Sequence, residues 1–474
     1  MATYYVDLLN GSDSAAGTSE GAPWKRLRGM EGVSGTAAGA SYSASDVIYI
    51  RGACTAQSSG TNFWTIDSPY VNGVRILPWP GHTNYRIDAN RAYDRVVTVN
   101  RQCILDGLIA ERSKNDVATS AGIRISTSAS GAILRNCIAR DNGRFGFYGN
   151  NVSSAANITL EDCQAYGNDT LPTDASGAGR FAAGFNMDGT GGVTFIRCIA
   201  RHNGLNSNVG GDADGRGFSI VGGSDNCRLI ECVGYENGDT DGSISDVRNG
   251  SDVEGFNSDN VIVQGCYFYG SGAALEVKYS CDNWRVVGNV ILGVSYVLQW
   301  GAFGGVGSTG LKAYNNTIAL TRALQFGVAL GLSSGDADLR NNVFITARSD
   351  FPAVSIRNAD SDIDLSTITF DYNLHYGCGT NHVYFQNTSL SQAYALAAYQ
   401  ALTGASAHSV NSLDNTNPFL DSSYRPLPGS PCIGAGVYIP GAKHMGGMPM
   451  NASAPDIGAY RYQVERSIAL SRAI

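Results

Sequence analysis

Apolar and polar positions repeat along the chain as one unit, most clearly between Ile123 and Asn289. Each unit has a short apolar strand, a turn, a second strand that carries one recurring residue, and a glycine-rich loop. The recurring residue is cysteine in five units and asparagine in the next four: Cys137, Cys163, Cys198, Cys232, Cys266, Asn289, Asn316, Asn342 and Asn373. Neighbours in this series are 23 to 35 residues apart by subtraction. The period predicts a stacked β-solenoid, because each coil can bury its apolar face only against adjacent coils.

A second landmark keeps the same step. Asp225, Asp259 and Asp282 each precede the recurring residue of their unit by seven positions. Two independent landmarks in step indicate one register, so we interpret the extra residues of the longer units as surface loops.

Composition narrows the class of protein. The 59 glycines among 474 residues and the 16% of charged residues suit many short strands joined by tight turns. The net charge of -8 argues against a nucleic-acid partner, although acidic loops could bind a polyanion through bound cations. The start of the chain lacks the pattern of a signal peptide, and no apolar stretch is long enough to span a membrane. We therefore expect no membrane insertion.

The cysteines do not suggest a disulfide framework. Eleven cysteines in so long a chain are few, and five occupy equivalent positions in successive coils, where buried thiols are expected. No CxxC motif and no Cys/His cluster of zinc spacing appears, and the six histidines are scattered.

The two ends of the chain are expected to differ in structure from the repeating centre. We expect an N-terminal cap over residues 1–45, a β-helix over 46–388, and a C-terminal helix with closing segments packed on the solenoid over 389–474. Pro23 suits the first turn of a short helical segment in the cap. The C-terminal helix would start at Ser389 or Ser391 and end near Gly404.

Both ends of the chain resemble the pectate-lyase-like superfamily. At the start the resemblance lies in YYVD, GSD, GT and APWK followed by DVIYIRG. At the end it lies in NPFLDSSYRPLPGSPCIGAG and APDIGAYRYQ. The resemblance implies an all-β fold, a single-stranded right-handed parallel β-helix with an N-terminal cap and a short helix near the C-terminus. The superfamily includes polysaccharide lyases, hydrolases such as phage tailspike depolymerases, epimerases and structural proteins, so it does not specify an activity.

Strand alternation places one set of polar residues on an outer face of the central coils. The strict register turns Asp252 and Glu254 inward, where a buried pair of unpaired carboxylates is costly, so we favour a one-residue slip that places Glu254 outside next to Glu276. The expected outer face carries Asn186, Asp188, Ser219, Glu254, Glu276, Lys278 and Gln299. Lys278 is the single lysine expected on this face of the central coils.

Long acidic loops are expected to overhang this face, at residues 168–184, 204–217 and 238–252. One arginine in each loop, Arg180, Arg216 and Arg248, could clamp an acidic sugar or be a solvated charge. Trp300 could stack on a sugar or pack in the protein.

Three functions fit these residues. In a mechanism resembling that of the calcium-assisted lyases of the superfamily, Asp212, Asp214 and Asp241 would hold Ca²⁺ and Lys278 would remove the proton α to a uronate carboxylate. Cations nearby would lower the pKa of that lysine, whereas Glu276 would oppose the change. No organic cofactor is expected.

In a mechanism resembling that of tailspike glycosidases, two carboxylates would hydrolyse a glycosidic bond. Glu254 and Glu276, on adjacent coils about 5 Å apart, have the retaining separation, and Asp188 and Glu254, near 10 Å apart, approach the inverting one. The third function is a non-catalytic glycan-binding or structural virion protein.

We predict an enzyme that degrades an extended acidic bacterial or plant polysaccharide, with elimination favoured slightly over hydrolysis. The resemblance to tailspikes suggests a phage-tail depolymerase on a virion or an extracellular enzyme, and a homotrimer if it is a tailspike.

Overall fold

The computed structural model describes most of the chain: residues 1–68, 70–115, 117–150, 156–168, 181–204, 214–238, 250–293, 296–302, 308–321, 328–333, 336–346, 349, 352–357, 364–379, 382–386, 391–402 and 404–463. The burial of the side chains at 214, 296, 302, 328, 357 and 391 is not described.

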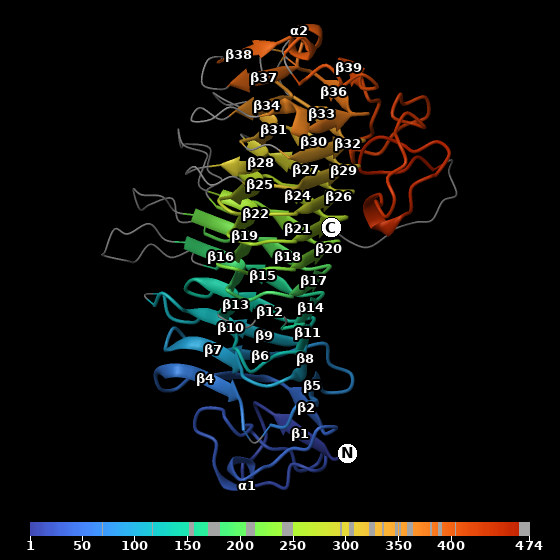
Figure 1. Ribbon diagram of the computed structural model, residues 1–474. Coiled ribbons are helices and arrows are strands. Elements are labelled where there is room, and N and C mark those ends of the chain that lie inside the picture. The colour runs from blue at the N-terminus through green and yellow to red at the C-terminus, as the bar shows by residue number, and fades with distance from the viewer. Residues whose placement is uncertain are drawn as a thin grey trace.

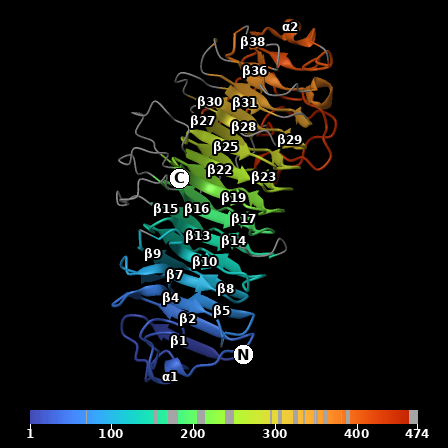
Figure 2. The ribbon, with the colours of Figure 1, turned by 60° about the vertical axis from the view of Figure 1, so that its left-hand side comes forward.

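The chain forms a parallel β-helix of three sheets with 13 strands each (Figure 1). Successive strands pass through the three sheets in turn, and, apart from the antiparallel β38, each strand pairs in parallel with the equivalent strand of the next coil. Figure 2 shows the same stack of strands from another side, with the sheets running the length of the molecule. The fold predicted from the period is confirmed.

The strands have the following bounds. Sheet A contains β1 (Thr3–Asp7), β2 (Val47–Arg51), β5 (Val74–Pro78), β8 (Cys103–Asp106), β11 (Ile133–Arg135), β14 (Thr159–Glu161), β17 (Thr194–Ile196), β20 (Arg228–Ile230), β23 (Ile262–Gln264), β26 (Arg285–Val287), β29 (Leu311–Tyr314), β32 (Ala337–Arg340) and β35 (Thr369–Asp371). Sheet B contains β4 (Gly60–Ile66), β7 (Tyr93–Val99), β10 (Ala121–Ile125), β13 (Phe145–Asn150), β16 (Phe181–Asp188), β19 (Asp214–Val221), β22 (Gly250–Phe256), β25 (Ala273–Lys278), β28 (Tyr296–Ala302), β31 (Val328–Leu332), β34 (Val354–Arg357), β37 (Val383–Gln386) and β38 (Ser391–Tyr394). Sheet C contains β3 (Ala53–Thr55), β6 (Tyr85–Asp88), β9 (Leu108–Glu111), β12 (Ile138–Arg140), β15 (Gln164–Tyr166), β18 (Ile199–Arg201), β21 (Val233–Tyr235), β24 (Tyr267–Tyr269), β27 (Val290–Gly293), β30 (Thr317–Leu320), β33 (Val343–Ile345), β36 (Leu374–Tyr376) and β39 (Leu413–Asp414).

The recurring cysteines and asparagines form one buried column at the short turn from sheet A to sheet C. The asparagines bond along the column, since Asn289 Nδ2 donates to Asn316 Oδ1 at 2.9 Å and Asn316 Nδ2 donates to Asn342 Oδ1 at 2.9 Å. All eleven cysteines lie in the described residues and are free thiols. Earlier coils place Tyr85 and Leu108 in the column, which is why the repeat is hard to see before residue 123.

A second ladder lines the turn from sheet C to sheet B. Asn142, Asn168, Asn203 and Asn237 are buried there, and each Nδ2 of the first three donates to the Oδ1 of the next asparagine. Ser271 continues the ladder after Asn237. These amides satisfy buried backbone groups at the turn that leads into the strands of sheet B.

The N-terminal segment differs from its prediction. The helical turn expected at Pro23 is wrong, because Trp24 instead bridges to Val6 as an extended residue, with its N–H bonded to the carbonyl of Tyr5 at 3.0 Å. A short helix, α1 (Gly35–Ala38), lies further along, and two 3₁₀ turns occur at Leu365–Thr367 and Met445–Gly447.

The C-terminal helix is shorter than predicted. Ser391 begins β38, which pairs antiparallel with β37, and α2 (Leu396–Gln400) follows it. The predicted helix start at Ser389 or Ser391 is therefore wrong, because the free edge of β37 binds this segment as a strand. Beyond β39 the chain turns back and packs Cys432 and Ile457 on Val343 and Leu374 of sheet C. No helix in the described ranges has the length and apolar character that a bilayer crossing requires.

Candidate functional site

The outer face of sheet B carries a column of polar residues across five adjacent strands. The register of β16, β19, β22, β25 and β28 aligns Asn186, Ser219, Glu254, Glu276 and Gln299. These are five of the residues that alternation placed on one face. Glu254 lies outside next to Glu276, as the one-residue slip required.

Asp252 lies inward, as the strict register placed it, so that register failed for Glu254 only. Asp252 stands near the start of β22, in the position that Gly146, Gly184 and Gly217 occupy in earlier coils. Its side chain is fully buried among the ladder residues, where Asn237 Nδ2 donates to Oδ1 at 2.9 Å and Ser271 Oγ donates at 2.6 Å. Asp252 and Val253 are both buried, so the alternation breaks between them, and Asp252 points inward although Glu254 lies on the outer face.

Four charged side chains meet on the outer face of sheet B, and we call them the charged cluster: Arg216, Glu254, Glu276 and Lys278. Lys278 Nζ lies 3.0 Å from Glu276 Oε2 and 3.7 Å from Glu254 Oε1. Arg216 Nη2 lies 3.1 Å from Glu254 Oε1 and 3.9 Å from Glu276 Oε2. Each carboxylate therefore contacts both cations.

The members of the charged cluster differ in their access to solvent. Arg216 is 1% exposed and the two glutamate side chains are below 10%, whereas the side chain of Lys278 is 18% exposed. Burial raises the pKa of Glu276, and the charges of Arg216 and Lys278 offset part of that rise. A buried carboxyl with a raised pKa next to an accessible amine can exchange a proton with that amine.

Arg216 does not lie where the sequence suggested. It belongs to β19 rather than to an overhanging loop, and its buried guanidinium contacts the two glutamates. The prediction that Arg216 clamps a sugar is corrected accordingly: the side chain is too buried to meet a ligand, and it holds the carboxylates in place.

Trp300 is a second correction. It aligns with Val277 and Leu332, which face the interior, and its side chain is fully buried with its ring centroid 6.3 Å from that of Trp284. A sugar cannot stack on it. Its neighbour Gln299 lies on the outer side, next to Glu276.

Asp188 lies on the same face but away from the charged cluster. It is at the end of β16, three strands from β25, and its Oδ2 accepts a hydrogen bond from Asn150 Nδ2 at 3.3 Å. At the usual strand spacing this separates it from Lys278 by about 14 Å, too far for direct cooperation. Asn186 lies two residues before Asp188 on β16 and belongs to the polar column. It is 3% exposed, and its Oδ1 has no hydrogen-bond partner.

The side chains of the predicted calcium ligands are not described. Asp212 and Asp241 lie outside the described residues, and Asp214 begins β19 with its side chain undescribed. The predicted sugar-binding residues Arg180 and Arg248 also lie outside the described residues. Across the ranges given above, no group of three or more His, Cys, Asp or Glu side chains could hold a metal ion. The described carboxylates of the charged cluster are engaged by Arg216 and Lys278, so they do not form a calcium site on their own. Calcium binding stays a prediction.

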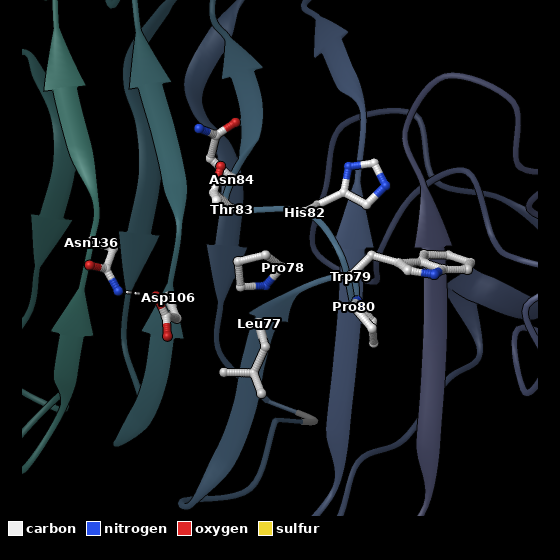
Figure 3. A pocket seen from close by; sticks show the side chains of 9 residues that line it. All are labelled: Leu77, Pro78, Trp79, Pro80, His82, Thr83, Asn84, Asp106 and Asn136. Carbon is white, nitrogen blue, oxygen red and sulfur yellow. Dashed lines mark hydrogen bonds between the residues drawn. The ribbon is translucent and has the colours of Figure 1, made fainter.

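A separate pocket lies near the N-terminal end, between sheets A and C. It is lined by Leu77, Pro78, Trp79, Pro80, His82, Thr83, Asn84, Asp106 and Asn136. Figure 3 shows Asn136 and Asp106 joined by a hydrogen bond, of 2.9 Å, and the ring of Trp79 turned away from them. The pocket lacks the paired cations and carboxylates of the charged cluster, so the cluster is the better candidate for chemistry.

Comparisons with known proteins agree with the fold. No family model and no curated protein matches the sequence. Among solved structures, pectate lyase Pel9A is 17% identical with a TM-score of 0.55, over 98% of this chain and 97% of that one. A rhamnogalacturonan lyase is 17% identical with a TM-score of 0.44, over 72% and 87%. The tailspike protein of E. coli bacteriophage HK620, solved with a pentasaccharide, is 11% identical with a TM-score of 0.39, over 72% and 56%. At these identities the likeness shows the fold alone.

Proposed function

We propose that the protein degrades an acidic polysaccharide by β-elimination on the outer face of sheet B, with Lys278 as the base. The observation that carries the proposal is the charged cluster, in which one accessible amine is held between two buried carboxylates. The similarity in fold to pectate lyase Pel9A over nearly the whole chain supports the same reading.

The chemistry needs Lys278 in its neutral form. Glu276 lies 3.0 Å away and favours the charged amine, whereas the positive charge of Arg216, which contacts the same carboxylates, favours the neutral one. The neutral amine would then remove the proton α to a uronate carboxylate. The electron pair of that C–H bond forms the new C=C bond, and the β C–O bond breaks as the leaving oxygen takes up a proton from water.

Arg216 has a supporting role in this proposal. Its guanidinium stays with Glu254 and Glu276 and keeps one positive charge in the site when Lys278 gives up its proton. Calcium held by Asp212, Asp214 and Asp241 would neutralise the uronate, and that part of the proposal depends on side chains that the structure does not describe.

Hydrolysis is the second candidate. The raised pKa of Glu276 suits a general acid, and Glu254 on the adjacent strand is at the spacing of a retaining pair. Against it, Arg216 and Lys278 both contact Glu254 and Glu276, so the space between the carboxylates holds cations rather than a glycosidic oxygen. Elimination fits this arrangement better.

The deciding experiment offers the protein polygalacturonate, alginate and neutral glycans, with and without a chelator. Ultraviolet absorbance of an unsaturated uronate and new reducing ends are followed together. Growth of absorbance supports elimination, and its loss with chelator supports the calcium site. Reducing ends without absorbance would show hydrolysis, and binding without either product would indicate a glycan-binding or structural protein.

The setting of the activity is part of the proposal. A bacterial surface glycan, an extracellular or phage-virion location and a homotrimer are consistent with a β-helix similar in fold to tailspikes. Light scattering of the purified protein tests the trimer, and a monomer would remove this support for the tailspike assignment.

A further inference from the structure

Two arginines lie on the outer face of sheet B, on the N-terminal side of the charged cluster. Arg124 of β10 aligns with Thr98 on one side and Tyr148 on the other, so it belongs to the same column as Glu254 and Glu276. Arg95 of β7 aligns with Ala121 of β10. Both arginine side chains are half-buried.

Neither arginine is neutralised by a carboxylate of the described residues. Arg95 Nη2 donates to Thr119 Oγ1 at 2.8 Å, and Asp94 beside it pairs instead with Lys114 at 3.2 Å. The Nε atoms of Arg95 and Arg124 are out of contact with solvent and have no hydrogen-bond partner. Arginine–carboxylate pairs are common elsewhere on the coils, as between Arg140 and Glu111. A half-buried guanidinium without a carboxylate partner is a position at which an anion can be bound.

The two positive charges also oppose each other. Burial, and next the charge of Arg124, lower the pKa of Arg95. Both arginines, with Arg144, act on the same phenol: burial and the charge of Asp188 raise the pKa of Tyr148, and the charges of Arg124, Arg144 and Arg95 oppose that rise. The guanidinium groups therefore converge on one region of the face.

An apolar cluster lies beside the arginines. Tyr148 stacks on Phe145 with ring centroids 4.8 Å apart, and both pack with Ala121 and Ala183 on the outer side of sheet B. Arginines next to aromatic and apolar side chains present donors at the edge of a surface that suits the C–H face of a sugar ring.

We propose that Arg95 and Arg124 form a distal subsite that binds a carboxylate of the polysaccharide, several sugar units from the point of cleavage. This inference rests on the proposed function and specifies its substrate as a long polyanion. Five strand steps separate β10 from β25 in sheet B, which places the subsite about 24 Å from Lys278. Two half-buried guanidinium groups can bind a carboxylate through paired hydrogen bonds.

The distance makes the inference testable by substrate length. Arg124→Gln and Arg95→Gln are measured on long polygalacturonate or alginate and on short oligomers of the same sugars. For long chains we expect KM to rise about tenfold with kcat unchanged, because the subsite contributes binding remote from the reacting bond. Oligomers too short to reach β10 should show wild-type KM. Arg124→Lys, which keeps the charge but loses the planar fork, should fall between wild type and Arg124→Gln.

Arg228→Gln is the matched control, since Arg228 is exposed on β20 of sheet A and the same charge is lost there. A binding assay on an inactive Lys278→Arg background measures retention on polygalacturonate, on methyl-esterified pectin and on dextran sulfate. Retention on polygalacturonate should fall in Arg124→Gln and not in the control, and the methyl-esterified polymer should not distinguish them.

Turnover by the wild type with no difference between Arg124→Gln, Arg95→Gln and Arg228→Gln on long chains would overturn the subsite and leave the proposed function standing. Loss of polymer binding in Arg124→Gln without turnover by the wild type would support the subsite and reject the enzyme. Stronger retention on dextran sulfate than on polygalacturonate would overturn the assignment of a carboxylate ligand.

Discussion

Glu254 and Glu276 lie opposite each other in the register of β22 and β25, and both contact the same two cations, Arg216 and Lys278. Neighbouring carboxylates would normally repel each other. Here Arg216 bridges them from the buried side and Lys278 from the accessible side. A ligand that approaches the charged cluster therefore meets Lys278 first, which is why the predictions begin with this residue.

Replacing Lys278 should abolish activity without unfolding the protein. Lys278→Arg keeps a positive charge near Glu254 and Glu276 but cannot give up its proton under ordinary conditions. We expect kcat to fall about 10²- to 10⁴-fold, the usual contribution of a general base, with little change in the urea midpoint. Lys312→Arg, on an exposed site of β29, is the control. Turnover of Lys278→Arg at the wild-type rate would remove the lysine from the mechanism.

Replacing Arg216 should instead act on stability. Arg216→Gln leaves Glu254 and Glu276 buried with one cation fewer, and breaking a buried ion pair from one side costs about 3–5 kcal/mol. Urea unfolding measures this loss. Arg197→Gln, whose salt bridges on Glu161 and Asp162 are exposed, should cost below about 1 kcal/mol.

A double variant measures how far Arg216 and Glu254 stabilise each other. Combining Arg216→Gln with Glu254→Gln removes both members of one pair, so the loss should be smaller than the sum of the two single changes. Strictly additive losses would show that Arg216 and Glu254 do not stabilise each other.

The stacked architecture could be predicted from the sequence because it depends on repetition. The buried column of Cys198 and Asn316 and their equivalents is visible as a period, and strand alternation then places Glu276 and Lys278 on the outer face. Alternation also assigns Trp300 to the interior once Gln299 is outside, so its proposed role in stacking conflicted with the pattern itself.

The strict register places Asp252 inward correctly, but the one-residue slip that fits Glu254 would turn Asp252 outward, so the structure was needed to show that the two residues differ. A comparison of successive coils carries a signal for it: Gly184–Phe185 and Gly217–Phe218 align with Asp252–Val253. A residue in that glycine column has to point inward. The contact of Arg216 with two glutamates depends on side-chain reach across strands, which period and alternation do not encode.

Asp252 should make the protein less stable as the pH rises. Burial raises the pKa of Asp252 to about 8. A carboxyl whose pKa is higher in the folded state holds its proton more tightly there than in the unfolded chain, where the value is about 3.9. The free energy of unfolding should therefore fall between these two values, by up to roughly 1.4 kcal/mol per pH unit, and level off above pH 8.

Asp252→Asn isolates this effect, because the amide stays neutral and its Oδ1 can still accept from Asn237 and Ser271. The difference in free energy of unfolding between the variant and the wild type, measured in urea at pH 5, 7 and 9, should grow in favour of the variant as pH rises. Glu20→Gln, at an exposed position, should show no such trend. A constant difference across the three pH values would mean that Asp252 ionises in the folded protein as it does in the unfolded chain.

The asparagine part of the buried column should contribute more to stability than the cysteine part. Asn316 Nδ2 donates to Val286 O at 2.8 Å and to Asn342 Oδ1 at 2.9 Å, and its Oδ1 accepts from the backbone N–H and the Nδ2 of Asn289. Asn316→Ala removes these bonds and leaves buried partners unpaired, which should cost about 2–4 kcal/mol. Cys198→Ala removes one small thiol whose hydrogen bond to Leu160 O is weak, so we expect about 1 kcal/mol.

Urea unfolding of Asn316→Ala and Cys198→Ala measures the difference between amide and thiol in equivalent positions. The comparison holds where the free energy of unfolding of both variants depends on urea concentration with the same slope. Asn316→Cys places the residue of the earlier coils in a later one and should recover packing but not the hydrogen bonds along the column. Its stability should therefore stay closer to that of Asn316→Ala than to the wild type. Equal costs for Asn316→Ala and Cys198→Ala would show that the column stabilises the solenoid through packing alone, and that the amide ladder adds nothing to it.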